Sequence, residues 1–446
     1  MNSSIFKILP VGLMLFSSFF GAGNLIFPPA LGASAGQEFW PAIIGFLVTG
    51  VGLPLLGIVV VAKTKSDNPE KIASGVHPLF ATILLVTVAL TIGPFFAIPR
   101  TAAVSFDIGI RPFLNQSGSE MFSLPLIIYS FVFFVLTYYF SVNPEKVLGW
   151  LGKVLTPLLL ISLGVLLIKA LLSPMGAPLA PLEAYTYAPF FKGFQDGYQT
   201  MDLLASCLFG TLVVLEIKAN KLADDSNLVK TCLQAGVIAI VLLGIIYSAL
   251  GYVGATSVGT IGRFANGGIA LAAIANSYLG DSGSIILAVV IILACLTTSV
   301  GVTVSCSSYF VKVAKDKIAY SRFVAGITIL SFIFANFGLT KIIAFSIPVL
   351  VALYPIIIAL VFLNLFGKLF DHRVLVYRCA IVLTAIMSLF DGLKVVSSEI
   401  GGIEVVTHID LVLGAIFPFY NVGFGWFIPM LVGALIGYLW SKSIKE

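Results

Sequence analysis

A short run near the start of the chain combines residues that can bind a ligand with residues that interrupt a helix. Gly21, Gly23 and Asn24 stand shortly before Pro28 and Pro29 in a stretch that is otherwise apolar. Glycine lets a ligand approach the main chain, and proline removes a helical hydrogen bond. Loosened main chain offers N–H groups to a carboxylate and carbonyl groups to a small cation. The run therefore predicts a broken membrane helix that lines a binding cavity; a kink used only for packing is the alternative.

A second interruption lies near 197–210, where Gly197, Asp202 and Gly210 stand in another apolar stretch. Asp202 is the carboxylate nearest to the middle of a predicted span, and a charged acid at that depth costs roughly 2.5–3.5 kcal/mol on the insertion scale. We therefore expect it to face a wet cavity, where it would bind an ion or carry a coupling proton. The alternative is a place near the outer mouth, where the carboxylate would cap a half-helix.

Two neighbouring hydroxyl groups, Thr297 and Thr298, interrupt an apolar span farther along the chain. Hydroxyl oxygens suit a hard cation such as sodium. Hydrogen bonds back to the same helix, or close helix packing, are the alternative uses of such residues.

Arg100 and Asp107 stand seven residues apart, toward the outer end of the predicted third span and on a similar helix face. They are candidates for an external gate. An arginine whose side chain reaches outward to the membrane interface is the alternative. Pro94 and Pro99 predict that this span bends.

The composition indicates where these residues must lie. Of the 446 residues, 59% are hydrophobic and 10% are charged, whereas soluble proteins carry about 25% charged residues. Lipid is the expected surrounding, and a span needs roughly 20 apolar residues. The apolar runs predict twelve spans, near 6–33, 40–62, 77–106, 122–140, 147–172, 194–217, 229–256, 284–311, 320–336, 340–365, 373–394 and 422–441. The longest expected loops are 173–193, 257–283 and 395–421, the last with a short helix.

Basic residues predict the orientation of these spans. With the N-terminus in the cytoplasm, 18 of the 25 lysines and arginines face inward, as the positive-inside rule requires. Both termini are then cytoplasmic, and the net charge of +5 reflects topology and not a nucleic-acid partner. The alternative, a cleaved signal peptide within 1–35, would remove the first break and leave an odd number of spans.

The two predicted breaks occupy corresponding places, in the first and the sixth span. Spans one to five cover about 6–172 and spans six to ten about 194–365, so the two halves are similar in length. Because five is odd, the second half enters the membrane from the opposite side, as in an inverted repeat with broken helices. We expect one transmembrane domain over 1–446, with two additional helices at about 373–441.

Motifs of several other protein classes are missing from the sequence. No Walker, H-E-x-x-H or G-x-S-x-G sequence occurs, so neither an enzyme nor an ATP-driven pump is expected. The five cysteines form no C-x-x-C pair, which disfavours a zinc site or a disulfide framework. We expect no cofactor.

Four segments resemble those of a known family. They are the run from Phe20 to Pro29, the run from Gly93 to Ala102 with Ser105-Phe106-Asp107 after it, the run from Gly197 to Asp202, and Leu296-Thr297-Thr298. They are similar to segments of the bacterial branched-chain amino acid:cation symporters, the BrnQ-type or LIVCS family, in which many members have Glu at the place of Asp107. The resemblance covers essentially the whole chain. It implies the amino acid–polyamine–organocation superfamily and an all-α integral membrane protein with the leucine-transporter fold.

The resemblance also implies site residues. The sodium site would use carbonyl groups or hydroxyls of Ser17, Phe20, Ala294, Thr297 and Thr298. The substrate carboxylate would meet the amides of Ala22 and Gly23. The substrate site as a whole would comprise Phe20, Gly21, Ala22, Gly23, Asn24, Thr200, Asp202, Leu203 and Ala205. Asp202 departs from the better-known members of the fold, and a second sodium near Asn24 stays open.

The expected function is sodium-coupled import of leucine, isoleucine and valine across the bacterial cytoplasmic membrane by alternating access. The expected partners are the amino acid, the sodium ion and the lipid bilayer, with no nucleic acid. An apolar pocket with Phe20 and Phe209 would receive the substrate side chain. The nearest alternative is a proton-coupled or exchange-type carrier with Asp202 as the proton group; a channel and an intramembrane enzyme are more distant alternatives.

Overall fold

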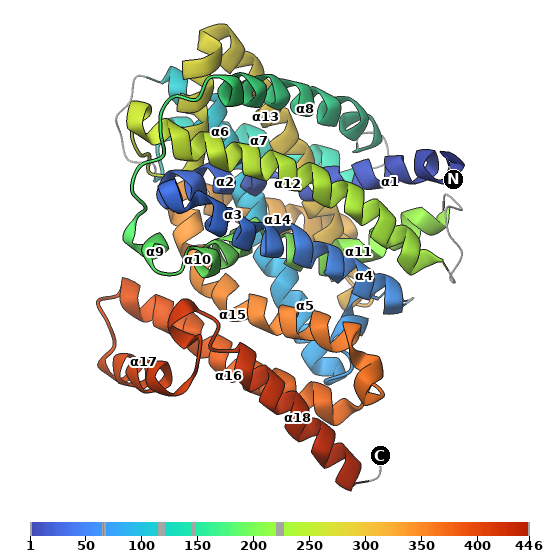
Figure 1. Ribbon diagram of the computed structural model, residues 1–446. Helices are drawn as coiled ribbons and strands as arrows, with labels where there is room; N and C mark the ends of the chain where they lie inside the picture. The colour runs from blue at the N-terminus through green and yellow to red at the C-terminus, as the bar shows by residue number, and fades with distance from the viewer. Residues whose placement is uncertain are drawn as a thin grey trace.

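The computed structural model describes residues 2–64, 66, 68–114, 121–143, 148–219 and 227–444, and within them every regular element is a helix (Figure 1). The α-helices are α1 (Asn2–Phe19), α2 (Ala22–Ala35), α3 (Phe39–Leu47), α4 (Leu53–Thr64), α5 (Pro78–Leu90), α6 (Ala97–Gly109), α7 (Leu124–Val142), α8 (Leu148–Leu172), α9 (Glu183–Thr186), α10 (Pro189–Asp196), α11 (Asp202–Ala219), α12 (Leu228–Ile261), α13 (Gly267–Val313), α14 (Tyr320–Ala335), α15 (Leu339–Leu365), α16 (Val374–Glu399), α17 (Glu404–Ile416) and α18 (Phe427–Ser443). Short helical turns are η1 (Gly36–Glu38), η2 (Val48–Gly52), η3 (Pro69–Ile72), η4 (Thr91–Phe95), η5 (Arg111–Phe113), η7 (Gly197–Thr200), η8 (Gly367–Phe370) and η9 (Tyr420–Val422).

The predicted all-α membrane class is confirmed. In the described ranges, seven helices are long and apolar enough to cross a membrane: Ala22–Thr64, Pro78–Phe113, Leu124–Val142, Leu228–Ile261, Gly267–Val313, Leu339–Leu365 and Val374–Glu399. Shorter apolar helices cover Ile8–Ser17, Pro157–Leu172, Asp202–Thr211, Tyr320–Ala335 and Phe427–Ser443. The first long helix runs across the expected boundary between two spans, so the count of twelve stays a prediction.

Both predicted helix breaks are confirmed. Helix α1 ends at Phe19, and α2 begins at Ala22 after Gly21 has adopted an extended conformation with φ −108° and ψ −172°. In the second break, η7 follows α10, and Met201 takes a left-handed conformation with φ 61° before α11 begins at Asp202. Each break thus lies next to the polar residues singled out in the sequence.

The two prolines that follow the first break do not themselves interrupt the helix. Pro28 and Pro29 lie inside α2, and not at the two residues where the helix is interrupted. They come close to α12, since a Cβ atom on Gly254 would lie 2.2 Å from the main-chain oxygen of Pro29. The glycine makes the break, and the prolines belong to the packed part of the helix.

The predicted bend of the third span is confirmed. It divides into α5 and α6 at η4, a π-helical turn that contains Pro94 and in which Gly93 departs from helical geometry with φ −82° and ψ −114°. Helix α6 is buried from Ile98 to Gly109. Its polar residues are thus held inside the protein.

The expected loop at 257–283 is wrong. Helix α12 continues to Ile261, and α13 begins at Gly267 and changes direction at Gly280, which has φ 65°. The first part of α13 carries buried apolar residues such as Leu271 and Ile274, and their burial stabilises a helix where the sequence showed no single long apolar run. The short helix expected within 395–421 is α17.

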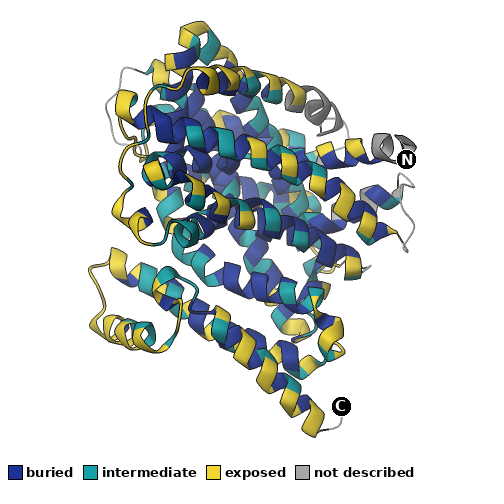
Figure 2. Ribbon diagram, viewed as in Figure 1, coloured by how far each residue is buried: buried dark blue, intermediate teal, exposed yellow. Residues whose placement is uncertain are grey.

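The broken helices lie inside the bundle, and the C-terminal helices lie at one side of it. Helix α2 packs against α12, α13 and α6, whereas α16 packs against α15 and α18. Figure 1 shows α16, α17 and α18 in red along one edge of the molecule. Figure 2 shows many exposed positions on these helices and mostly buried ones on the central helices. Much of that exposed surface is leucine, isoleucine and valine, as expected for contact with lipid.

Candidate functional site

A cavity of about 60 Å³ lies between the two breaks. A single water needs roughly 10–15 Å³ of such space, so the cavity can hold several atoms of a ligand. Helices α1, α2 and α6 meet helices α11 and α13 there. Its lining residues are Phe19, Gly21, Ala22, Gly23, Asn24, Ile92, Ala97, Arg100, Thr101, Thr200, Met201, Asp202, Ala205, Phe209, Thr298 and Val302.

A hydrogen-bonded group around Asn24 joins the two broken helices. The side-chain nitrogen of Asn24 contacts a carboxylate oxygen of Asp202 at 2.8 Å, the main-chain oxygen of Phe19 at 2.8 Å, and the hydroxyl of Tyr247. All three side chains are buried, Asn24 at 1% and Asp202 at 4% exposure. The contact gives the Phe19 carbonyl group, at the end of α1, a second donor beside the main-chain N–H of Gly21. Asp202 therefore faces the cavity and not the outer surface.

The first turn of α2 forms part of the cavity wall. Gly21 at the N-cap supplies no side-chain hydrogen bond to this turn. A Cβ atom on Gly21 would lie 3.3 Å from Thr298 Cγ2, and one on Gly23 would lie 3.2 Å from Arg100 Nη1. The glycines thus allow α6 and α13 to approach the break closely, and the start of α2 carries a partial positive charge.

Arg100 is buried in the cavity wall. Only 2% of the residue is exposed, so the outward-reaching alternative is wrong. Its Nη1 donates to the main-chain oxygen of Gln199 in η7 at 2.5 Å, and its guanidinium lies 4.9 Å from the centre of the Phe27 ring. The side chain therefore links α6 to both broken helices.

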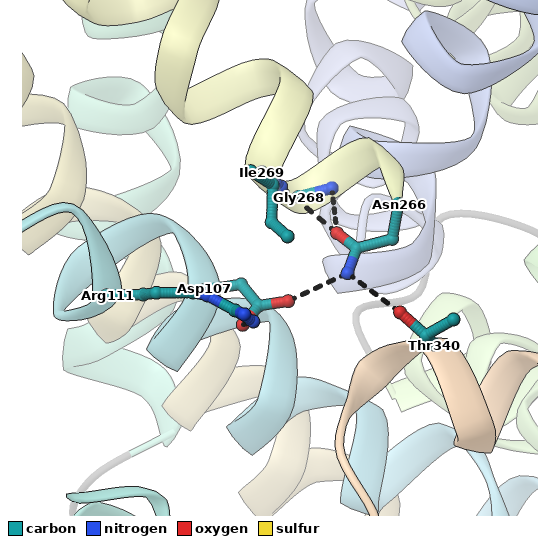
Figure 3. A network of polar contacts seen from close by, with 6 residues as sticks. All are labelled: Asp107, Arg111, Asn266, Gly268, Ile269 and Thr340. Carbon is teal, nitrogen blue, oxygen red and sulfur yellow. Dashed lines mark hydrogen bonds and ion pairs between the residues drawn. The ribbon is translucent and has the colours of Figure 1, made fainter. Parts of the chain in front are cut away.

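Asp107 belongs to a different polar group, shown in Figure 3. It contacts Arg111 at 3.1 Å and accepts a hydrogen bond of 3.0 Å from the side-chain nitrogen of Asn266. The same nitrogen contacts the Thr340 hydroxyl at 3.2 Å, and the Asn266 oxygen caps the first turn of α13. Arg100 and Asp107 thus contact different groups, and Asp107 joins α6 to the starts of α13 and α15.

The predicted sodium ligands on α13 lie close together. The hydroxyls of Thr297 and Thr298 both donate to the main-chain oxygen of Ala294, at 2.8 and 3.0 Å. These bonds are the ones expected for the alternative in which the hydroxyls bond their own helix. They also gather three oxygens, and Thr298 lines the cavity beside Gly21. The donor set is therefore of the all-oxygen kind that suits a hard cation.

The structure brings eight of the residues predicted for the substrate and sodium sites into the cavity wall, and Arg100 of the predicted gate with them. Gly21, Ala22, Gly23, Asn24, Thr200, Asp202, Ala205 and Thr298 line the cavity. Phe20, Leu203, Ser17, Ala294 and Thr297 are outside this lining. Leu203 packs toward α4, since a Cβ atom on Gly57 would lie 3.5 Å from Leu203 Cδ1.

Several residues of the candidate site were not predicted from the sequence. Ile92, Ala97 and Thr101 come from the two sides of the η4 bend, and Tyr247 of α12 contacts Asn24. The predicted bend at Pro94 was the available signal for the first three, because a bent helix exposes main chain and small side chains to a neighbour. Nothing in the sequence around Tyr247 indicates its partner 223 residues away.

A second, larger cavity of about 480 Å³ lies among α9, α10, α15, α16 and η9. Its lysines are already paired, Lys394 with Asp410 at 2.6 Å and Lys192 with Asp196. It contains none of the residues of the first break. The smaller cavity is therefore the better candidate site, because the residues of both helix breaks line it.

Solved structures with the same arrangement define the class of protein. Mhp1 in an inward-facing conformation aligns with 98% of this chain and 91% of its own, with a TM-score of 0.59 and 12% identity. Mhp1 in a closed conformation with bromovinylhydantoin bound, a transporter of the nucleobase-cation-symport-1 family, gives a TM-score of 0.60 at 14% identity, with 98% and 93% covered. The chain therefore has the leucine-transporter fold.

Sequence comparison then gives the family. The profile described as "Branched-chain amino acid transport protein" matches residues 4–444, and the chain belongs to this family. The branched-chain amino acid permease BraB of Bacillus subtilis is 44% identical, with 97% of this chain and 95% of that protein covered. The branched-chain amino acid transport system 2 carrier protein of Pseudomonas aeruginosa is 36% identical, with 99% and 97% covered. The family and the apolar helices together make this a multi-pass membrane protein.

Proposed function

We propose that the protein imports leucine, isoleucine and valine together with sodium by alternating access. The family and its relatives, named as branched-chain amino acid permeases and carriers, support the substrate class. The observation that carries the proposal is the cavity between two interrupted helices, joined by the contact between Asn24 and Asp202. Interrupted helices at such a cavity are the typical site of secondary transporters.

The amino acid would bind at the two breaks. Its carboxylate would meet the first turn of α2, at the N–H groups of Ala22 and Gly23, where the helix dipole favours a negative charge. Its aliphatic side chain would contact the apolar part of the lining, which includes Ile92, Phe209 and Val302. One methylene in an apolar pocket is worth about 1–3 kcal/mol, so the three branched substrates would be separated only coarsely.

Sodium, as the co-transported ion, would bind where α1 ends and α13 passes. The proposed ligands are the main-chain oxygens of Ser17, Phe20 and Ala294 and the hydroxyls of Thr297 and Thr298. The two hydroxyls now donate to the oxygen of Ala294. A bound cation would turn the lone pairs of the two hydroxyls toward itself. It would also hold Gly21 against α13, because Thr298 of α13 lies next to Gly21. Substrate affinity would then depend on sodium through the shape of the break.

The group around Asp107 would close the outer side of the site. It joins three helices at the end of α6 by hydrogen bonds and an ion pair (Figure 3).

We propose a cytoplasmic-membrane protein with both termini inside, as the distribution of basic residues predicts. The sodium gradient would drive accumulation. The membrane potential contributes about 2.3 kcal/mol for each charge moved across 100 mV.

Uptake of labelled leucine into proteoliposomes tests the proposal. We expect accumulation with an inward sodium gradient, saturation with leucine, and competition by isoleucine and valine. Equal uptake with and without the gradient would reject sodium coupling. Uptake that neither saturates nor accumulates would indicate a channel, and a chemically altered product would indicate an enzyme.

A proton-coupled or exchange-type carrier is the second candidate. The buried carboxylate of Asp202 favours it, because this group accepts a hydrogen bond from Asn24 and has no basic side chain within ion-pair distance in the described ranges. Accumulation driven by a pH gradient without sodium would support this candidate. Dependence of uptake on leucine preloaded inside the vesicles would support exchange.

A further inference from the structure

Arg100 has hydrogen-bond donors that none of the described residues uses. In the part of the chain that the structure describes, its Nε and Nη2 atoms are buried and have no hydrogen-bond partner. Only Nη1 is engaged, with the main-chain oxygen of Gln199. A buried charged donor without an acceptor is costly, and such groups in native proteins call for an explanation. Because Arg100 lines the cavity, a bound anion would be that explanation.

The start of α2 converges on the same place. Arg100 Nη1 lies 3.2 Å from where a Cβ atom of Gly23 would be, in the first turn of a 14-residue helix whose N-cap supplies no side-chain acceptor. The dipole of this helix and the guanidinium therefore act on one point of the cavity. Arginine also presents its donors as a planar fork, which matches the two oxygens of a carboxylate.

A buried carboxyl group faces the same cavity from the other broken helix. Asp202 is 4% exposed, begins α11 and lines the cavity together with Arg100. Within the described ranges, no ion pair joins the two residues. A ligand with a single charge would compensate one residue and leave the other buried without an opposite charge on the ligand, which is unfavourable. A ligand with both charges would satisfy each of them.

We propose that Arg100 and Asp202 form a clamp for a free α-amino acid, in which Arg100 and the first turn of α2 bind the carboxylate and Asp202 binds the ammonium group. This inference rests on the proposed function, since it takes the cavity as the substrate site. It assigns Arg100 to substrate recognition instead of gating, and it gives Asp202 an ammonium partner instead of a transferred proton. It also requires both charged groups on the substrate, so leucinamide, isopentylamine and 4-methylpentanoate should be rejected.

Binding to the purified full-length protein tests the clamp. Labelled leucine is displaced by unlabelled leucine, by leucinamide, which lacks the carboxylate, and by 4-methylpentanoate, which lacks the ammonium group. We expect the wild-type protein to favour leucine over each analogue by at least about 100-fold, because a site built to pair with a group rejects ligands that lack it. Wild-type protein that binds leucinamide or 4-methylpentanoate as tightly as leucine would overturn the clamp without any variant.

Two variants then separate the two ends of the clamp. R100Q should weaken leucine binding and reduce the preference for leucine over leucinamide to less than about 10-fold, while the preference over 4-methylpentanoate persists. D202N should do the reverse. R100K, which keeps the charge but loses the fork, should fall between wild type and R100Q. Monodispersity and melting temperature of each variant show that it is folded.

The outcomes distinguish the clamp from the proposed function. If wild-type protein binds leucine and R100Q keeps the full preference for leucine over leucinamide, the clamp is wrong and the proposed function stands. If wild-type protein binds no branched-chain amino acid, the proposed function fails. A gating role for Arg100 would lower the transport rate of R100Q and leave its ligand preferences unchanged, and this result would also overturn the clamp.

Discussion

The side-chain amide of Asn24 donates a hydrogen bond of 2.8 Å to the carboxylate of Asp202 and so joins the two interrupted helices directly. The two residues are separated by 178 positions in the chain. One lies in the first turn of α2 and the other is the first residue of α11. Any movement of one helix half relative to the other must therefore change this contact, which places it at the centre of the expected transport cycle.

Exchanging the two side chains tests this link. N24D alone brings two carboxylates together in a buried place. We expect the free energy of unfolding to fall by about 1–3 kcal/mol or more, as is typical for a buried group that loses its partner, and the melting temperature to fall with it. The double variant N24D/D202N again has one amide and one carboxylate, and should recover the part of the lost stability that comes from this pair, since the bond to the Phe19 carbonyl is missing in both variants. The measurement is thermal unfolding in detergent. A double variant no more stable than N24D would show that the two side chains are not coupled in the folded protein.

Thr298→Ala tests the sodium site. Loss of one hydroxyl ligand should raise the sodium concentration for half-maximal leucine uptake by about tenfold, equivalent to about 1.4 kcal/mol. The relative uptake of leucine, isoleucine and valine should stay the same, because the hydroxyl would bind the ion and not the aliphatic side chain. Uptake is measured in proteoliposomes over a range of sodium concentrations.

Thr303→Ala is the matched control for that change. Thr303 is a buried threonine on the same helix, α13, and its hydroxyl has no hydrogen-bond partner in the described part of the chain. Its removal should leave the sodium dependence unchanged. Equal shifts in the two variants would mean that Thr298 affects helix packing and not ion binding.

The sequence predicted the two breaks well because their causes are local. Glycine and polar residues interrupt the apolar run at 21–24 and again at 197–202, and a membrane helix that is interrupted in lipid leaves main-chain groups without hydrogen-bond partners. The residue that leaves helical geometry in the second run is Met201 and not Gly197, which the sequence did not indicate. The bend at Pro94 was predicted for the same kind of cause. The helix in the first part of α13 was not predicted, because its stability comes from packing of residues such as Leu271 against the bundle.

The site was predicted in part, for a related reason. Main-chain groups at a break can be inferred from the break alone, and these residues of α2 do line the cavity. The contacts of Tyr247 with Asn24 and of Arg100 with Gln199 depend on tertiary structure across long stretches of chain. A single sequence indicates that Arg100 is costly in a membrane, but only the structure shows that it is buried in the cavity wall and does not reach the membrane interface.

Close packing of α2 against α12 predicts a strong effect at one glycine. A Cβ atom on Gly254 would lie 2.2 Å from the main-chain oxygen of Pro29, and a main-chain atom cannot move aside as a side chain can. G254A should therefore destabilise the protein by at least about 1–3 kcal/mol. G244A on the same helix is the control, since no heavy atom lies within 4 Å of its Cβ position. Thermal unfolding in detergent measures both, and equal melting temperatures would contradict the packing shown here.

Replacement of Asn266 tests whether the group in Figure 3 closes the outer side of the site. Aspartate at this position still caps α13, but its carboxylate would face Asp107, which now accepts a hydrogen bond from the Asn266 amide. The repulsion should favour separation of α6 from α13 and α15. N266S is the matched control, because serine also caps a helix and adds no charge. We expect leucine uptake to fall in the order wild type, N266S, N266D.

The change in accessibility distinguishes gating from a general loss of stability. Thr101 lines the cavity on α6, and T101C gives a thiol there that a membrane-impermeant reagent can reach only when the outer side is open. Labelling of T101C from outside should be several-fold faster with N266D than with N266S, because only the aspartate repels Asp107. Protein that retains Thr101 measures the background from the five native cysteines, four of which are buried. If N266D and N266S are labelled at the same rate, Asn266 caps the helix without controlling access, and the outer gate must be sought elsewhere.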